Sequence, residues 1–305
     1  MAWPIVQVTS TKSITEYKFI GGGYLPMIMC ALMLATIFVP YFIILFTKTL
    51  NPFLPFVSQV AGSPPQSGVF CLLLALSSLL AFIGLNLLYM CVRLQKKKID
   101  DQWVRSTVAL LNRISLIPGH FAILGMLVVG AFPIDFHRTQ ENWITITITP
   151  HLIGALLLFL GGMFYCILIT YIMSLLHPKQ RQILGIRVFL ICLITMCAAL
   201  QGYTVREGFM DELDEANRVG NCNWSVSMLS YNLSYLISSV SEWSLLIAFI
   251  VFFMTFREEA KDFTFTMSIT HREEPIANSD DNEPTAEDEN HNVENIEDKV
   301  DILQE

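Results

Sequence analysis

Glu242 is the most conspicuous residue of this 305-residue sequence, because it lies inside an apolar run, Leu233–Phe256. A carboxylate at the centre of a membrane costs about 2.5–3.5 kcal/mol even on the mildest insertion scale. We therefore expect Glu242 to face other helices and to be protonated or paired, with His120, His151 and Gln201 as candidate partners. Three roles are open for it: an interhelical hydrogen bond, a contact with a ligand or lipid head group, or a proton relay.

His120, His151 and Glu242 have the side-chain types of a zinc site, but they lie in three separate apolar runs. Zinc sites usually show ligands a few residues apart, as in Cys-x-x-Cys or His-Glu-x-x-His, and the sequence contains neither pattern. Six of the seven cysteines also lie in apolar runs, which indicates no disulfide framework. We predict no metal site, no cofactor and no catalytic residues, and hence a protein that is not an enzyme.

Charge is distributed unevenly along the chain. Residues 257–305 contain 16 acidic and 4 basic residues, a net charge of −12, so the preceding residues carry +4 of the total of −8. We expect membrane lipids to contact the apolar body and cytosolic proteins to bind the basic loop 93–113 and the acidic tail; we expect no nucleic-acid partner. Lys96, Lys97 and Lys98 either attract anionic lipid, at about 1 kcal/mol per charge, or serve only to orient the chain in the membrane.

Six apolar runs are long enough, or nearly so, to cross a bilayer of about 30 Å at about 1.5 Å per residue. Backbone groups in lipid must form their hydrogen bonds internally, so each run is predicted to be a helix. The fold class is therefore all-α, a polytopic bundle of six transmembrane helices. The predicted spans are Leu25–Phe46, Val69–Val92, Ile114–Phe132, His151–Leu176, Val188–Tyr203 and Leu233–Phe256.

The orientation of the bundle follows from the basic residues near the ends of the spans, because lysine and arginine are retained in the cytosol. Alternate assignment of the loops gives 13 such residues on one side and 4 on the other. Both termini are therefore predicted to lie in the cytosol. The 13 residues are Lys12, Lys18, Arg93, Lys96, Lys97, Lys98, Arg105, Arg113, Lys179, Arg181, Arg187, Arg257 and Lys261.

This topology divides the chain into a cytosolic N-terminal segment (1–24), a six-helix membrane domain (25–263) and a disordered acidic cytosolic tail (264–305). The tail contains few apolar residues to bury, which is typical of disorder. Residues 204–232 form a predicted outer loop, and Asn223 begins an Asn-Trp-Ser sequon within it. We therefore predict a glycoprotein modified at Asn223.

The first predicted outer loop is rich in proline and glycine. Pro52, Pro55, Pro64 and Pro65 fix the backbone φ angle, and Gly62 permits a turn. We expect a stiff, ordered loop. In the fourth predicted span, Gly154 and the pair Gly161-Gly162 would allow close packing of helices.

Several of these motifs together resemble the DRAM family, the damage-regulated autophagy modulators, within the wider DRAM/FRAG/SFK superfamily that shares a domain with Cwh-type proteins. The matching residues of the first loop are Asn51, Pro52, Pro55, Ser58, Gly62, Pro64 and Pro65, and those of the helices are His151, Gly154, Arg187, Glu242 and Trp243. The resemblance covers about residues 25–265. Two positions depart from the family pattern, because Gln59 and Gln66 replace acidic residues, so this loop lacks those two negative charges.

The resemblance implies a non-catalytic membrane protein that regulates autophagy and lysosomal processes. It implies residence in lysosomes or other endomembranes, with the plasma membrane as the alternative. Related branches of the superfamily provide a second interpretation, in which the protein handles lipid in GPI-anchor remodelling or organises a phosphoinositide kinase at the plasma membrane. In that case Glu242 and His151 would contact the lipid head group.

Overall fold

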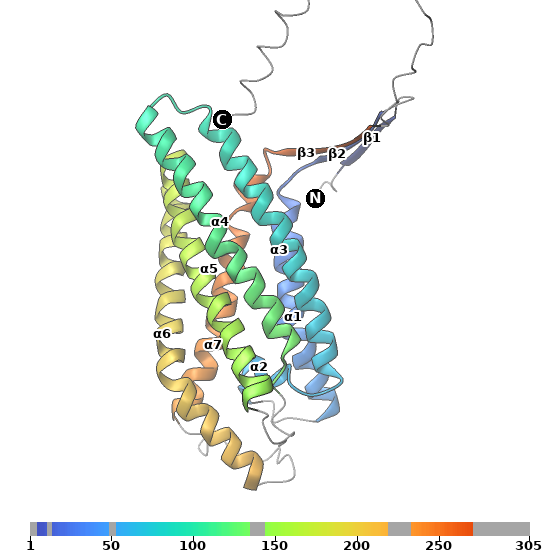
Figure 1. Cartoon of the computed structure of the whole chain (residues 1–305), viewed down its shortest axis with the longest axis vertical. Coiled ribbons are helices and arrows are strands. Elements are labelled where there is room, and N and C mark those ends of the chain that lie inside the picture. Colours follow the sequence, from blue (N-terminus) through green and yellow to red (C-terminus); the bar gives the residue numbers. More distant parts are fainter. Residues whose placement is uncertain (1–4, 11–13, 49–52, 135–143, 219–232, 271–305) are drawn as a thin grey trace, which may run out of the picture. The chain divides into compact units, whose positions relative to one another are not determined.

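The computed structural model describes residues 5–10, 14–48, 53–134, 144–218 and 233–270. The chain divides into two units, one of residues 1–8 with 17–267 and one of residues 9–16 with 268–305. The first unit contains the helical bundle (Figure 1).

The bundle contains six helices that are long and apolar enough to cross a membrane, as predicted. They are α1 (Tyr24–Thr47), α3 (Gln66–Lys96), α4 (Gln102–Ala131), α5 (Thr149–Leu176), α6 (Arg181–Arg218) and α7 (Leu233–Met254). Shorter helical segments are α2 (Val57–Val60), the π-helical η1 (Ile144–Ile148) that precedes α5, and α8 (Arg257–Ala260).

Two helices begin well before the predicted span. Helix α4 begins at Gln102 rather than Ile114, and the Asp101 carboxylate caps it by accepting from the backbone N–H of Trp103 (2.8 Å) and Val104 (3.2 Å). Such a cap satisfies N–H groups that have no partner within the helix. Helix α6 likewise extends beyond the predicted run at both ends. Hydropathy detects only the part of a helix that lipid surrounds, and polar turns can continue the helix into water.

The helices form a ring in chain order. Each long helix packs against the next, and α7 packs against α1 to close the ring. Helices α4 and α5 approach each other closely at glycines, as predicted for Gly154. A Cβ atom at Gly154 would lie 2.8 Å from a methyl carbon of Val128, and one at Gly125 would lie 2.4 Å from the backbone nitrogen of Leu158.

The two ends of the bundle differ in character. The starts of α1, α4 and α6 and the ends of α3, α5 and α7 meet at one end, which we call the basic end, at the top of Figure 1. The backbone N–H of Gly22 donates to the carbonyl of Phe263 (3.0 Å) there, so both ends of the bundle segment lie on one side. That this side faces the cytosol stays a prediction from charge. The opposite end, formed by residues 53–65 and Phe132, is called the loop end.

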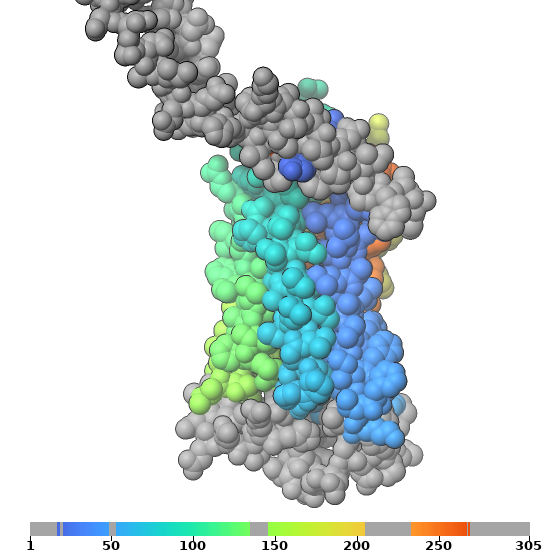
Figure 2. All heavy atoms as spheres, turned by 90° about the vertical axis from the view of Figure 1, so that its right-hand side faces the viewer, coloured from blue at the N-terminus to red at the C-terminus, as the bar shows by residue number. Residues whose placement is uncertain are grey.

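The outer surface of the bundle is apolar. Figure 2 shows the face formed by α1, α3 and α4. An apolar surface of this extent on a soluble protein would cause association, whereas lipid contact requires it. Large exposed apolar residues on these three helices include Phe42, Leu79, Phe82, Leu110 and Ile117.

Strands flank the bundle segment in the sequence, which the sequence analysis did not predict. They are β1 (Ile5–Ser10), β2 (Ile14–Ile20) and β3 (Thr264–Thr270), paired in the order β1-β2-β3. Their sequences contain many β-branched and aromatic residues, which favour strands. Strand β3 covers the first residues of the segment predicted to be a disordered tail, and residues 271–305 lie outside the described part.

Candidate functional site

The first loop is fastened to helix α7. The Ser239 hydroxyl donates to the carbonyl of Leu54 (2.6 Å), and the Trp243 indole N–H donates to the carbonyl of Pro55 (2.9 Å). Residues three and four apart lie on one face of a helix. Ser239, Glu242 and Trp243 therefore present a single row of polar groups to the loop.

Glu242 supplies the charged contact of this junction. Its Oε2 accepts from the backbone N–H of Val57 (2.8 Å), and its Oε1 lies 3.4 Å from the backbone nitrogen of Ser58. These N–H groups begin helix α2, where they have no partner within the helix. Hydrogen bonds to a carboxylate are about twice as strong as neutral ones, so they offset part of the cost of burying the charge.

The predicted partners of Glu242 are therefore wrong. Its hydrogen bonds go to Val57 and Ser58 of the loop, mainly to their backbone N–H groups, and not to His120, His151 or Gln201. The sequence indicated a buried, partnered carboxylate, but the partners are N–H groups, which every residue except proline has and no motif marks.

Aromatic rings fix the same junction from two sides. The Trp243 ring lies 5.8 Å from the rings of both Phe38 and Tyr41 on α1. On the loop, the Phe56 ring meets the Tyr235 ring edge-on at 5.0 Å. Such pairs add about 0.5–1.5 kcal/mol beyond the burial of their area. The described part of the loop, from Phe53, is thus held between α1 and α7.

Gly62 is required where the first loop meets the segment after α4. A Cβ atom at this position would lie 2.0 Å from the carbonyl oxygen of Ile134, which no side chain tolerates. Pro65 lies directly before α3, and Pro64 and Pro65 are exposed. Asn51, Pro52 and Asn223 lie outside the described residues.

Neither histidine forms a hydrogen bond with Glu242. His151 is buried, and its Nδ1 lies 2.8 Å from the carbonyl oxygen of Phe132, at the end of α4. His120 makes a similar contact at 2.7 Å, but within its own helix, to Leu116. Among the described residues, no group of three or more His, Cys, Asp or Glu side chains could hold a metal ion.

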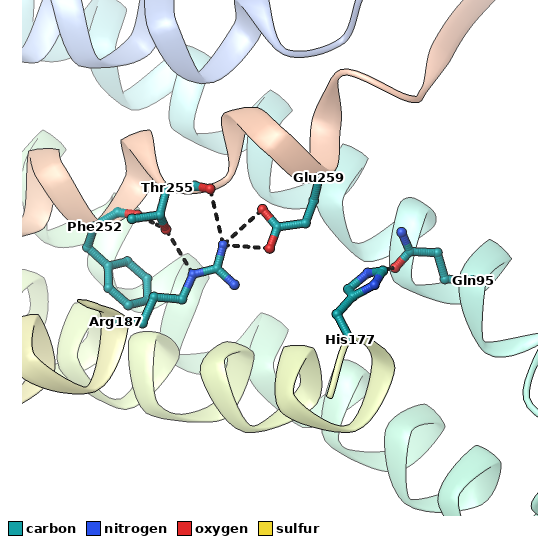
Figure 3. Close-up of polar contacts among 6 residues, drawn as sticks. All are labelled: Gln95, His177, Arg187, Phe252, Thr255 and Glu259. Carbon is teal, nitrogen blue, oxygen red and sulfur yellow. Dashed lines mark hydrogen bonds and ion pairs between the residues drawn. The ribbon is translucent and has the colours of Figure 1, made fainter. Parts of the chain in front are cut away.

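A second polar cluster lies at the basic end, around Arg187 (Figure 3). Arg187 is 1% exposed, and its Nη2 lies 2.8 and 2.9 Å from the two carboxylate oxygens of Glu259. Its Nε donates to the hydroxyl of Thr255 (2.8 Å), and the guanidinium lies 4.1 Å above the Phe256 ring. The cluster therefore joins α6 to the end of α7 and to α8.

Arg187 is thus a helix residue of α6 rather than the loop residue that the charge count assumed. Glu259 was not singled out from the sequence. A signal existed, because a buried arginine needs an acidic partner, and Glu258 and Glu259 follow the last span. Figure 3 also shows His177 and Gln95, whose Nε2 and Oε1 atoms lie 3.3 Å apart and link the ends of α5 and α3.

The segment that forms this bundle is the part of the chain that matches known proteins. Residues 21–263 match the family described as Frag1/DRAM/Sfk1/Cwh43P N-terminal domain. The chain is 24% identical over 248 residues to DNA damage-regulated autophagy modulator protein 1 of Homo sapiens, which covers 81% of this chain and 94% of that protein. It is 23% identical over 246 residues to DNA damage-regulated autophagy modulator protein 2 of Rattus norvegicus, covering 80% and 85%.

A further relative is more similar over a shorter stretch. The chain is 31% identical over 193 residues to the modulator of macroautophagy TMEM150B of Xenopus tropicalis, which covers 63% of this chain and 72% of that protein. No solved structure matches the chain. The matched family segment contains both the Glu242 junction and the Arg187 cluster.

Proposed function

Because the chain belongs to the Frag1/DRAM/Sfk1/Cwh43P N-terminal domain family, we propose that it is a non-catalytic multi-pass membrane protein that modulates autophagy. We place it in lysosomes or other endomembranes. The observation that carries the proposal is the likeness to DNA damage-regulated autophagy modulator protein 1, which spans 94% of that protein and so includes nearly all of its length. The relative named a modulator of macroautophagy supports the same process.

The positions of the two polar clusters agree with a bundle that acts by binding other proteins at its surface. Glu242 and Arg187 both form contacts within the chain, which stabilise the loop end and the basic end. Exposed basic residues remain at the basic end, in the turn between α3 and α4 and beside it. We propose that cytosolic proteins bind there, with the acidic tail as a second binding segment. The basic residues are Arg93, Lys97, Lys98 and Arg105.

The alternative function, in GPI-anchor remodelling or as a phosphoinositide-kinase scaffold, is not favoured by these relatives. Their names refer to autophagy or macroautophagy. We therefore propose only the autophagy function.

Cells that lack the protein test this proposal. We expect lysosome-dependent turnover of an autophagosome marker to fall, and to recover when the full chain is expressed again. A tagged chain should overlap lysosomal or other endomembrane markers. Unchanged turnover in cells without the protein would refute the function, and a signal confined to the plasma membrane would refute the proposed compartment.

The proposed binding surface needs a separate variant. Replacing Lys97 and Lys98 with glutamine should reduce the rescue of turnover while leaving the amount of protein in the membrane unchanged, because both side chains are exposed. Replacing the exposed Lys179, which lies in the turn between α5 and α6, provides the matched control. Full rescue by the double variant would argue against the turn between α3 and α4 as a binding surface.

A further inference from the structure

A narrow cavity runs along the inside of the helical ring. Its volume is about 230 Å³, and its walls come from α1, α3, α4, α5 and α7. His151 and Val57 line it at the loop end, and Glu259 and Phe263 line it at the basic end, so the cavity is much longer than it is wide. Between these ends the walls are mainly apolar, with Met33, Leu74, Leu88, Met126, Phe159 and Phe249.

In a membrane, lipid acyl chains are available to occupy a cavity with such walls. Side chains that face an empty space lose dispersion contacts, and apolar cavities do not hold water but take up apolar molecules. The outer faces of the bundle are apolar and require a lipid environment. Long acyl chains are therefore the molecules most abundant next to the cavity, and their shape matches its length.

His151 adds a specific polar group at the loop end. The side chain is 5% exposed, and its Nδ1 lies 2.8 Å from the carbonyl oxygen of Phe132. A carbonyl oxygen can only accept, so Nδ1 carries the proton and donates. In the neutral ring, Nε2 then carries a lone pair, and no described residue donates to it. Among the described residues this acceptor therefore has no donor, and His151 lines the cavity.

A second polar side chain that lines the cavity also accepts hydrogen bonds. Glu242 lines the same cavity, and its carboxylate already accepts from Val57 and Ser58. The side chain that complements an acceptor is a donor, and an uncharged donor at the end of a long apolar body is a hydroxyl group. A carboxylate or a phosphodiester would lack such a donor and would add negative charge to the cavity that Glu242 lines.

We propose that the cavity binds one long-chain lipid with a hydroxyl head group. The hydroxyl donates to Nε2 of His151, and the acyl chain lies along the cavity toward the basic end. This site is independent of the autophagy function and of the partner surface at the basic end. It assigns His151 one specific contact, in which the ring Nε2 accepts from the hydroxyl of the lipid.

Photolabelling of the purified full chain tests the site. The probe is hexadecanol that carries a diazirine in its chain, and the labelled peptides are identified by mass spectrometry. We expect labels on cavity residues of α4, α5 and α7, and competition by unlabelled hexadecanol about fivefold stronger than by hexadecyl methyl ether, which cannot donate. Labels only on lipid-facing side chains, or equal competition by alcohol and ether, would overturn the proposal.

Matched variants separate the cavity from the hydroxyl contact. Ala155→Phe fills the cavity and should abolish labelling of its walls, whereas Ala199→Phe on the exposed side of α6 should not. His151→Asn keeps a donor for Phe132 but removes the Nε2 acceptor, so the advantage of alcohol over ether should disappear. His120→Asn is its control, because His120 makes the same type of Nδ1 contact but does not line the cavity.

Each variant is first checked for a single peak in size-exclusion chromatography. If His151→Asn does not fold, competition by hexadecanol and by its ether on the natural sequence still tests whether the site prefers a hydroxyl group. An alcohol preference that persists in folded His151→Asn would refute the role of His151. Undiminished labelling of the cavity walls in folded Ala155→Phe would refute the cavity as the binding site.

Discussion

At the scale of single residues, buried charges in this protein are paired with groups that are distant in the sequence. Glu242 is bound to backbone N–H groups 184 and 185 residues away, and Arg187 is bound to a carboxylate 72 residues away. Removing one partner of such a pair leaves the other buried without compensation. Single substitutions should therefore have large effects, whereas exposed pairs such as Glu258 with Lys261 should matter little.

Glu242→Gln tests the loop junction. The amide oxygen can accept from one backbone N–H, but the amide nitrogen would face the second donor, so one hydrogen bond is lost and the other becomes a neutral bond. We expect a loss of stability of about 1–3 kcal/mol, measured as a lower melting temperature in detergent, together with faster protease cleavage of the first loop. Glu258→Gln is the control. Equal melting temperatures for Glu242→Gln and the natural chain would show that these hydrogen bonds do not contribute to stability.

Arg187→Met tests the second cluster. It leaves the Glu259 carboxylate buried without its partner, so we expect a loss of about 3–5 kcal/mol, visible in the same melting assay. The double variant Arg187→Met with Glu259→Met removes both charges and should recover most of that loss. Lys261→Met, which breaks only the exposed pair, should melt almost normally. A double variant less stable than the single one would contradict this account.

At the scale of elements, the closest contacts occur where glycine lets two segments approach. Gly154 and Gly125 allow α4 and α5 to touch along their backbones, and Gly62 brings the first loop against Ile134. Other glycines are not needed for a close contact. Gly68, near the start of α3, has open space where a Cβ atom would lie. The same substitution should therefore have opposite effects at the two kinds of position.

Gly62→Ala and Gly68→Ala form a matched pair. At Gly62 the added carbon would overlap the Ile134 carbonyl, so we expect a loop that cannot close and a large drop in the yield of monodisperse protein. At Gly68 the methyl group meets nothing, and alanine favours a helix by up to about 1 kcal/mol over glycine, so the melting temperature should rise slightly. Equal yields from both variants would disprove the close approach at Gly62.

At the scale of the whole molecule, six spans closed into a ring place the two ends of residues 21–263 on one side. The basic residues at the end of α3, at the starts of α4 and α6, and in the turn between α5 and α6 gather at that same end. The charge rule assigns this end to the cytosol. The loop end and the Asn223 sequon should therefore lie on the opposite side of the membrane.

Tags at both termini and glycosidase digestion test this orientation. In cells whose plasma membrane alone is permeabilised, antibodies should reach both tags. Digestion with a glycosidase should increase the mobility of the natural chain on gels, but not that of Asn223→Gln. Asn232 begins a second sequon, Asn-Leu-Ser, directly before the last span, too close to the membrane for modification. Asn232→Gln should therefore behave like the natural chain. Tags that are accessible on opposite faces would refute a topology with both ends in the cytosol.

Local composition was enough to predict the spans and the asymmetry of charge. A span is recognised by summing hydrophobicity over adjacent residues against a fixed bilayer thickness, so the run that starts at Leu25 agrees closely with α1. The motif resemblance also marked the first loop and Glu242 as important. The polar turns that extend α4 to Gln102, and the strands at either end, were missed, since neither has the apolar length of a span.

Only the tertiary structure decided which groups meet. Whether Glu242 contacts a histidine or the loop depends on how each helix is rotated about its axis and shifted along it, relative to helices far away in the chain. These quantities arise from the packing of the whole ring, and no short segment encodes them. The contacts of Glu242 with Val57, the pairing of Arg187 with Glu259 and the cavity between the helices therefore came from the structure alone.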